Sequence, residues 1–559
     1  MEIFVQPGPR LGNEYADDWI LRSYLQRALP GDMLARIDPE LTEMGRLAGG
    51  ELFEMQLADR LDEPALVQWD SWGNRVDRIE LTPLWRRAEE LAVKFGLTAI
   101  PYERRHGRYS RLHQFALVYL FHPSTDVFTC PLAMTDGAAR TLIESGNQDL
   151  VDRYVPHLAS RSPKEFWTSG QWMTEATGGS DVGASLTRAV PGADGSWRLY
   201  GKKWFTSAAT SQMALALARP DGNPPGGSGL ALFLVETRDR AGKLQGIRVE
   251  RLKDKLGTRK VPTAELTLDG APAQLVAGST QGTRRIEPML KITRVWNSVC
   301  ACAFMRRGVA LAHDYAERRR VFGSALVEQP LHRDTLAALQ AELAGAFHLT
   351  FELVSLLGRE EAGELDETGR QLLRLMLPIT KLVTGKQSVQ VASEVLEAFG
   401  GAGYIEDTGL PLLLRDSQVL PIWEGTTNVL SLDALLRTDI ASGLRAWQLR
   451  ISSALDGVTD PRLAAGVRVT RERLEAALGW FAATKEPEVL QSGARRFAMT
   501  LGRSLQLALL VEHAQWAAGS SEGEGAIDGS IALVERLAQA PIASLDDLQP
   551  TTDAILGTL

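Results

Sequence analysis

The chain has few of the residues that build disulfide frameworks and metal sites. Its 559 residues include three cysteines, Cys130, Cys300 and Cys302, with no CxxC spacing. An odd, sparse set of cysteines is typical of a reducing compartment and predicts neither a disulfide framework nor a zinc site. The eight histidines include no HExxH motif and no pair four residues apart, so we expect no metal.

An N-terminal signal, a long uninterrupted apolar run and a positive net charge are also missing. Residues 1–19 carry acids and a proline where a secretory signal needs basic residues and then an apolar stretch. Residues 295–312, the most apolar long segment, are interrupted by Arg306 and Arg307 and are predicted to form a buried helix. The formal net charge of −8 argues against a general polyanion binder. We expect a cytoplasmic protein with no membrane span.

The residues that are present predict a large folded protein. Hydrophobic residues make up 44% of the chain and charged residues 23%, as in soluble globular proteins. The pattern is helical up to about residue 165, then becomes short alternating runs, and is helical again after about residue 286. We predict a mostly α fold with an N-terminal helical domain over 1–168, a central antiparallel β domain over 169–285, a four-helix bundle over 286–440 and a helical C-terminal extension over 441–559.

Two short stretches near the start of the β region carry candidate ligand-binding groups. Residues 171–189 read QWMTEATGGSDVGASLTRA, whose hydroxyls and glycines can approach a phosphate or a polar ring edge, although an exposed turn explains them equally well. In the following GKKWFTSA, Trp204 and Thr206 are two residues apart and are predicted to face one side of a strand. A flat ring could lie against Trp204 while Thr206 bonds its edge, and core packing is the alternative for the tryptophan.

One carboxylate stands in an apolar neighbourhood. Residues 420–430 read LPIWEGTTNVL, in which Glu424 is the one charged residue. Burial raises the pKa of a carboxyl group, so Glu424 is predicted to be either a tuned base or a structural liability. A glutamate that caps the start of a helix is the alternative.

Six blocks of the sequence resemble a known family. MTEATGGSDV, KKWFTSA, RLKDKLGTRKVPTAELTLDG, ERRRVFGSALVEQP, LEAFGGAGY and IWEGTTNV occur in the order and approximate spacing of flavin-dependent acyl-CoA dehydrogenases. This resemblance covers roughly residues 90–440. The N-terminal part, CPLAMTDGAA at 130–139 and the C-terminal segment more closely resemble the AidB branch, flavoproteins linked to the bacterial response to DNA alkylation.

The resemblance implies FAD as the cofactor. The block after residue 171 would bond the isoalloxazine edge and the pyrophosphate, and the KKWFTSA block would cover the ring. The RxxFG arginine would meet the cofactor of a neighbouring chain, and the last two blocks would touch its adenine end. The implied cofactor-binding residues are Met173, Thr174, Gly179, Ser180, Trp204, Phe205, Thr206, Arg319, Phe322, Gly400, Gly401, Trp423, Gly425, Thr426 and Asn428.

The same resemblance implies α,β-dehydrogenation of an acyl-CoA thioester. Glu424 would take the proton alpha to the thioester carbonyl while a hydride leaves the beta carbon for flavin N5. Arg294 would hold a polar group of the substrate, although a structural ion pair is equally consistent. Met134 and Thr135 would line the acyl pocket, with core packing as the alternative for the methionine.

The expected partners follow from the family. We expect acyl-CoA as substrate, a separate electron-transfer partner, and a homo-oligomer, a tetramer, because the FAD site is shared between chains. An AidB-like flavoprotein that binds DNA with little turnover is the rival function, and an oxidase is a third. Residues 441–559 contain eleven basic and fourteen acidic residues, which disfavours DNA binding.

Overall fold

The computed structural model describes residues 6–193, 195–437, 439–520, 523–546 and 555. The chain divides into two compact units. The first, which we call the helical unit, comprises Met1–Gly50, His106–Leu120 and Asn297–Leu559, and the second, the β unit, comprises Glu51–Arg105 and Phe121–Trp296. The predicted fold class, mostly helical with a central β domain and an extra helical C-terminal region, is confirmed. The four domain boundaries stay predictions.

Three helices of 32 residues form the centre of the helical unit, and α10 begins in the β unit. They are α10 (Glu287–Arg318), α11 (Pro330–Glu361) and α12 (Glu367–Ala398). The fourth helix of the predicted bundle is short: α14 (Thr427–Leu432) passes into a π-helical turn at Asp433–Arg437. By length and composition α11 is apolar enough to cross a membrane, but 83% of its apolar window is buried inside the protein, so it is a core helix.

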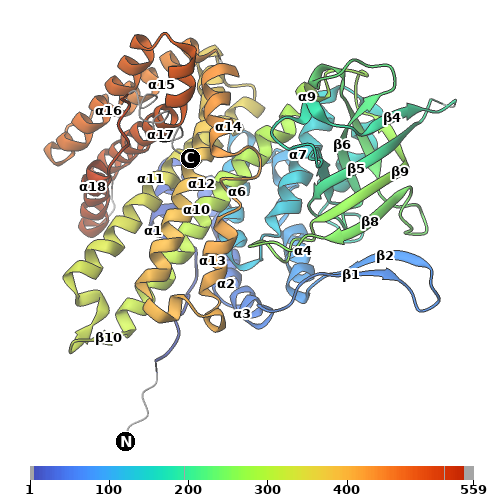
Figure 1. Ribbon diagram of the computed structural model, residues 1–559. Helices are drawn as coiled ribbons and strands as arrows, with labels where there is room; N and C mark the ends of the chain where they lie inside the picture. The colour runs from blue at the N-terminus through green and yellow to red at the C-terminus, as the bar shows by residue number, and fades with distance from the viewer. Residues whose placement is uncertain (1–5, 194, 438, 521–522, 547–554, 556–559) are drawn as a thin grey trace, which may run out of the picture. The chain divides into compact units, whose positions relative to one another are not determined.

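The C-terminal region packs against these helices. The fourth helix of 32 residues is α17 (Pro487–Ala518), which contacts both α11 and α12, and α16, α17 and α18 lie side by side in Figure 1. Arg503 of α17 forms a 2.6 Å ion pair with Glu342 of α11. The remaining elements of this unit are α1 (Trp19–Ala28), α2 (Gly31–Gly49), α6 (Ser110–Phe121), β10 (Arg320–Val321), β11 (Ser324–Ala325), α13 (Leu410–Ser417), α15 (Ile440–Leu455), α16 (Ala464–Ala483) and α18 (Glu524–Gln539).

The β unit contains a sheet whose strand pairings close on themselves. The strands follow the order β3, β6, β4, β5, β9 and β7, with an added β6–β7 pairing, and β8 pairs with β9. Most pairs are antiparallel as predicted, but β6 pairs in parallel with β3 and with β4. The strands are β3 (Ser169–Trp172), β4 (Arg188–Pro191), β5 (Trp197–Thr206), β6 (Met213–Pro220), β7 (Ala231–Glu236), β8 (Ile247–Leu252) and β9 (Ala264–Leu275).

Small residues allow this closed sheet to form around one core. Ala214, Ala216 and Ala218 alternate along β6 and are buried together with Phe233 and Leu199. Alternate residues of a strand point to one face, so the MALALA run places three methyl groups inside and leaves room for the larger side chains of neighbouring strands. The sheet therefore offers a rigid frame for the loops that leave β3 and β5.

A hairpin lies in the region that the sequence pattern assigned to helices. It is formed by β1 (Ala65–Trp69) and β2 (Arg75–Glu80) and lies beside β8 (Figure 1). Asp77 accepts a hydrogen bond from the Val249 amide at 3.0 Å, and Trp72 at the turn is 89% exposed. The other helices of this unit are α3 (Glu51–Ala58), α4 (Pro83–Phe95), α5 (Ile100–Glu103), α7 (Thr129–Ser145), α8 (Gln148–Leu158) and α9 (Gly282–Arg285).

The three cysteines are free and buried. Cys130 lies on α7, and Cys300 and Cys302 lie on α10. Burial raises the pKa of the Cys302 thiol to about 12, so this thiol is unreactive in the folded chain. Among the described residues, no group of three or more His, Cys, Asp or Glu side chains is placed to hold a metal ion.

Candidate active site

The loop after β3 gathers polar groups that are open to a ligand. Met173 and Thr174 are half-buried, and Gly179 and Ser180 are exposed. A side chain at Gly179 would meet Thr174 at 3.2 Å, so the glycine keeps the loop tight. The Oε1 atom of Gln171 is buried without a hydrogen-bond partner among the described residues. The loop therefore presents hydroxyl groups, and the adjoining strand β3 carries an unpaired acceptor, as binding to a polar ring requires.

Glu175 fixes the shape of this loop from inside the β unit. Its carboxylate is 4% exposed and accepts hydrogen bonds from the Leu186 amide at 2.7 Å and the Thr187 hydroxyl at 2.6 Å. It also forms a 2.7 Å ion pair with Lys203, whose side chain is completely buried. Neither Glu175 nor Lys203 was among the predicted site residues, although both lie inside the MTEATGGSDV and KKWFTSA blocks.

The end of β5 departs from the predicted alternation. The pairing of β5 with β9 shifts between Lys203 and Thr206, so Lys203 and Thr206 are buried while Trp204 is half-buried and Phe205 is 50% exposed. That Trp204 and Thr206 face one side of the sheet stays a prediction, and the irregularity between them changes which residues of the strand face each way. The Thr206 hydroxyl donates to the Ala264 carbonyl at 2.6 Å, which leaves its oxygen as an acceptor.

A lysine outside the predicted set lies against the two aromatic rings. The Lys253 ammonium is 3.5 Å from the ring centroid of Trp204 and 4.6 Å from that of Phe205. It also forms a 2.7 Å ion pair with Glu265, and its side chain is 8% exposed. Cation–π contact with a desolvated ammonium restricts the ring, so Lys253 holds Trp204 in place.

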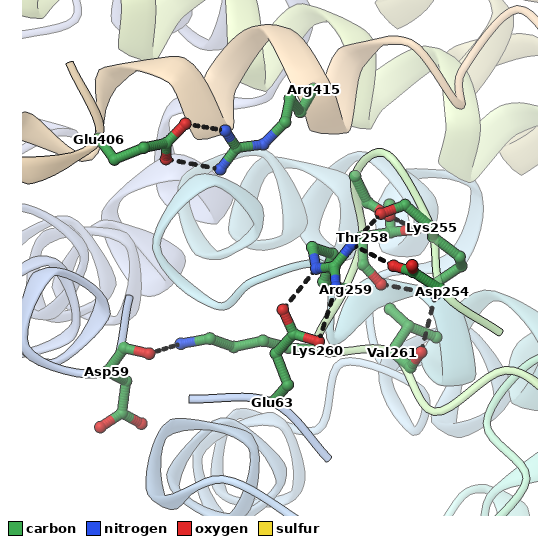
Figure 2. A network of polar contacts seen from close by, with 11 residues as sticks. Asp59, Glu63, Asp254, Lys255, Thr258, Arg259, Lys260, Val261, Glu406 and Arg415 are labelled. Atoms are coloured by element: carbon green, nitrogen blue, oxygen red, sulfur yellow. Dashed lines mark hydrogen bonds and ion pairs between the residues drawn. The ribbon is translucent and has the colours of Figure 1, made fainter. Parts of the chain in front are cut away.

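The loop from Lys253 to Thr263 is braced by its own polar network. Figure 2 shows Arg259 bonded to Glu63 and Asp254, and Lys255 donating to carbonyls of the same loop. The Lys260 ammonium donates to the Asp59 carbonyl at 2.6 Å (Figure 2). It also pairs with Asp126 at 2.8 Å. A cavity of about 190 Å³ lies beside this loop. The network keeps the segment that carries Lys253 rigid.

The three predicted substrate-binding residues differ in how deeply they are buried. Met134 and Thr135 lie on α7 and are buried, 7% and 0% exposed. The Thr135 hydroxyl donates to the Pro131 carbonyl at 2.7 Å and accepts from the Ser169 amide at 3.0 Å, so it joins α7 to β3. Arg294 is half-buried on α10. Their role in substrate binding stays a prediction.

Glu424 lies in a strained turn in the helical unit. Its φ is 55°, a left-handed conformation that non-glycine residues rarely adopt, and φ of the following Gly425 is 105°. The buried Lys381 of α12 donates to the Gly425 carbonyl at 2.6 Å. The cap of α14 is Thr426, whose hydroxyl accepts from the Val429 amide, so the helix-cap alternative for Glu424 is wrong. Glu424 itself is half-buried in this chain, as are Trp423 and Thr426, whereas Asn428 is exposed.

Strain at a carboxylate is a structural sign of function. Left-handed backbone at a non-glycine residue costs about 1–3 kcal/mol and persists only where surrounding contacts hold it. Here the contact comes from the buried ammonium of Lys381. No local sequence pattern predicts it, because Lys381 and Glu424 are 43 positions apart. The Trp423 indole nitrogen, next to Glu424, is buried without a partner among the described residues.

The RxxFG and GGAG blocks come together at one end of the helical unit. Arg320–Val321 and Ser324–Ala325 form a hairpin whose turn is Phe322–Gly323, with φ values of 49° and 89°. Phe322 at this turn is 98% exposed. The rings of Tyr315 and Phe399, which precede the two blocks, are 4.6 Å apart. Arg319 is half-buried and bonds Gln6 at 3.3 Å.

The glycines of the GGAG block have two different surroundings. A side chain at Gly400 or Gly401 would meet no atom within 4 Å, so both face open space. A side chain at Gly403 would lie 2.0 Å from the Leu396 carbonyl, so this glycine is needed for close packing against α12. The open glycines are free to let a ligand approach the backbone.

Family models match the chain along most of its length. The model described as acyl-CoA dehydrogenase, middle domain, matches residues 170–271, and the corresponding C-terminal domain matches residues 280–437. The N-terminal domain of adaptive response protein AidB matches residues 7–163. The model described as acyl-CoA dehydrogenase 11 C-terminal domain-like matches residues 443–528.

Similar proteins cover the whole arrangement. Acyl-CoA dehydrogenase family member 11 of Caenorhabditis elegans is 42% identical over 535 residues, which are 91% of this chain and 86% of that protein. AidB of Escherichia coli K12 is 33% identical over 451 residues, 78% of this chain and 79% of that one. The crystal structure of C. elegans ACDH-11 in complex with C11-CoA has a TM-score of 0.93 at 39% identity and covers 99% of this chain and 96% of that one. A Bacillus anthracis structure with FAD shares the fold, with a TM-score of 0.71 at 17% identity over 95% of this chain and 90% of that one.

Proposed function

Because the chain belongs to the acyl-CoA dehydrogenase family, with the N-terminal domain of AidB and the C-terminal domain type of ACDH-11, we propose that it dehydrogenates an acyl-CoA thioester at the α and β carbons with FAD. The observation that carries this proposal is Glu424, a carboxylate held in a strained turn by the buried Lys381. A C. elegans relative crystallised with C11-CoA supports an acyl-CoA as the substrate.

The residues of the β unit fit a flavin. The hydroxyls of half-buried Thr174 and exposed Ser180 can bond its ring edge, and the Gln171 Oε1 atom is a buried acceptor without a partner among the described residues. Trp204 offers an aromatic face, and the Thr206 oxygen is an acceptor at the end of β5. A flavin supplies a ring with donors and acceptors at its edge and accepts a hydride from the substrate.

Glu424 acts as the base in this proposal. It removes the α proton, and its backbone amide is directed by the same turn that fixes its side chain, so one loop supplies the base and a donor for the developing negative charge. Lys381 keeps that turn in its left-handed form by bonding the Gly425 carbonyl. Arg294, Met134 and Thr135 contact the substrate.

The proposal extends to the assembly and its partners. Phe322 is 98% exposed at a hairpin turn, which is costly for a large apolar side chain unless another molecule covers it. We propose that a second copy of the chain covers it in a tetramer and that Arg319 there meets the neighbour's FAD. A separate protein carries the electrons onward, and the reaction takes place in the cytoplasm.

The decisive test compares the parent protein with Glu424→Gln. The purified yellow protein is mixed anaerobically with acyl-CoAs of graded chain length, and flavin bleaching is followed. Bleaching by one chain class that is lost in the variant, with FAD still bound, supports the proposal. If no thioester bleaches the bound flavin of the parent protein, the proposal is wrong.

DNA binding, the rival function, has less support in the C-terminal region. Arg473 is buried and bonds the carbonyls of Ala538 and Ala540, and Arg503 is engaged by Glu342. Arg468 pairs with Glu472. Arg473 and Arg503 are buried and bonded inside the protein, so they are not available to phosphates, whereas the Arg468 side chain is 65% exposed and has a surface partner. A gel shift with duplex DNA over a salt series tests this, and salt-sensitive binding would favour the rival.

A further inference from the structure

One buried ion pair joins the two segments that we propose contact the flavin. Glu175 directly follows Thr174, and Lys203 directly precedes Trp204. Their charged atoms are 2.7 Å apart, and their side chains are 4% and 0% exposed. The Trp204 amide also donates to the Thr174 carbonyl at 2.9 Å. The ion pair and the backbone bond therefore fix the same two neighbours relative to each other.

Every other part of this pair is also bonded. The Lys203 ammonium donates to the Leu217 carbonyl of β6 at 2.8 Å, and the Glu175 carboxylate accepts from Leu186 and Thr187. Burial opposes the charged form of Glu175, but the Lys203 ammonium and these donors hold its pKa below the ordinary value. Burial lowers the pKa of Lys203, and the Glu175 carboxylate, which accepts a hydrogen bond from its ammonium at 2.7 Å, opposes that shift.

A buried ion pair is not the most stabilising choice for such a position. Desolvation of two charges costs about as much as their attraction returns, and apolar pairs of the same size are often equally stable or more stable. The charges add geometric specificity, because charge-assisted hydrogen bonds form only in certain orientations of donor and acceptor. The pair bonds β6, the segment that leads into β4 and the two segments that we propose contact the flavin. It therefore fixes the arrangement of these four segments.

We propose that the Glu175–Lys203 pair is a positioning device that sets the distance between Thr174 and Trp204 and thereby shapes the site for the isoalloxazine edge. This inference rests on the proposed function. It assigns the pair a role in cofactor affinity and flavin environment, in addition to its contribution to folding.

The test separates positioning from folding with a neutral pair of similar shape. Glu175→Gln and Lys203→Met each leave a buried charge alone, and each is expected to lower the Tm by about 4 °C or more. The double variant removes both charges and is expected to recover most of that Tm. It should still bind FAD about tenfold more weakly and show a shifted flavin absorption band.

Two further variants keep the result interpretable. Glu342→Gln with Arg503→Met makes the same chemical change in a 2.6 Å pair of the helical unit and should leave FAD affinity and spectrum unchanged. Thr187→Val removes one hydroxyl donor to Glu175 without touching a charge, and should weaken FAD binding about threefold.

The outcomes are distinct. FAD affinity and spectrum that match the parent in both the double variant and Thr187→Val overturn the positioning role while leaving the proposed function intact. A parent protein that takes up no FAD overturns both. Weakened binding in the double variant with recovered Tm, and none in the helical-unit control, supports the inference.

Discussion

Replacement of Lys381 by methionine measures how much the turn at Glu424, the proposed base, depends on one hydrogen bond. The ammonium is completely buried and 2.6 Å from the Gly425 carbonyl. Loss of this donor leaves a carbonyl unsatisfied, at a cost of about 1–3 kcal/mol, and allows Glu424 to leave its left-handed conformation. Because about 1.4 kcal/mol is a factor of ten in rate, we expect flavin bleaching by acyl-CoA to slow by about 10- to 100-fold.

The assay follows anaerobic bleaching by stopped flow and, in parallel, unfolding in urea. Arg473→Met is the matched control, because Arg473 is also buried and also donates to carbonyls, those of Ala538 at 3.0 Å and Ala540 at 2.8 Å, away from the proposed site. It should lose stability without slowing the reaction of the folded fraction. If Lys381→Met loses stability to the same degree yet bleaches its flavin within twofold of the parent rate, the reasoning about the turn is refuted.

Three other predictions follow from single contacts. Phe322→Asp should shift the protein to smaller species in sedimentation velocity, because a charge cannot be buried against another copy; an unchanged oligomer contradicts the proposed interface. Burial lowers the pKa of His513 to about 3 and that of His348 well below its ordinary value, so the unfolded chain binds more protons than the folded chain below pH 6.5. The free energy of unfolding, measured by urea titration, should therefore fall by about 1.4 kcal/mol for each histidine and each pH unit between pH 6.5 and pH 5. A free energy that does not change over this range contradicts the burial of neutral rings. Gly403→Ala should lower the Tm by about 4 °C or more, since its new methyl group would lie 2.0 Å from the Leu396 carbonyl, and a Tm equal to the parent's would show that the turn relaxes freely.

The order of the elements was accessible from the sequence because helical and strand periodicities are local. The change of texture after the N-terminal helical region corresponds to β3 at Ser169–Trp172, and the long helices α10, α11 and α12 lie in the region over 286–440 that was predicted to be helical. The hairpin over Ala65–Glu80 escaped prediction. Its strands are short, and both are held by side-chain bonds to β8, more than 170 positions later in the chain.

The candidate site was predictable in its blocks but not in its contacts. The irregularity that turns Phe205 outward and Thr206 inward arises where β5 pairs with β9, and no pattern within β5 contains it. In the same way, the Gly425 carbonyl is bonded by Lys381 of a distant helix. Glu175 is important because of its ion pair with Lys203, which lies 28 positions later. Such pairings depend on tertiary structure, which local periodicity does not encode.

The three buried thiols allow the local unfolding of each unit to be measured by chemical labelling. Alkylating reagents react with thiolates that solvent can reach, so labelling of Cys130, Cys300 and Cys302 has to wait until the surrounding structure opens. Cys130 belongs to the β unit and the other two to the helical unit. Pulsed alkylation followed by peptide mass spectrometry therefore yields a separate opening rate for each unit. Bound FAD should slow the alkylation of Cys130 if the β unit holds the cofactor.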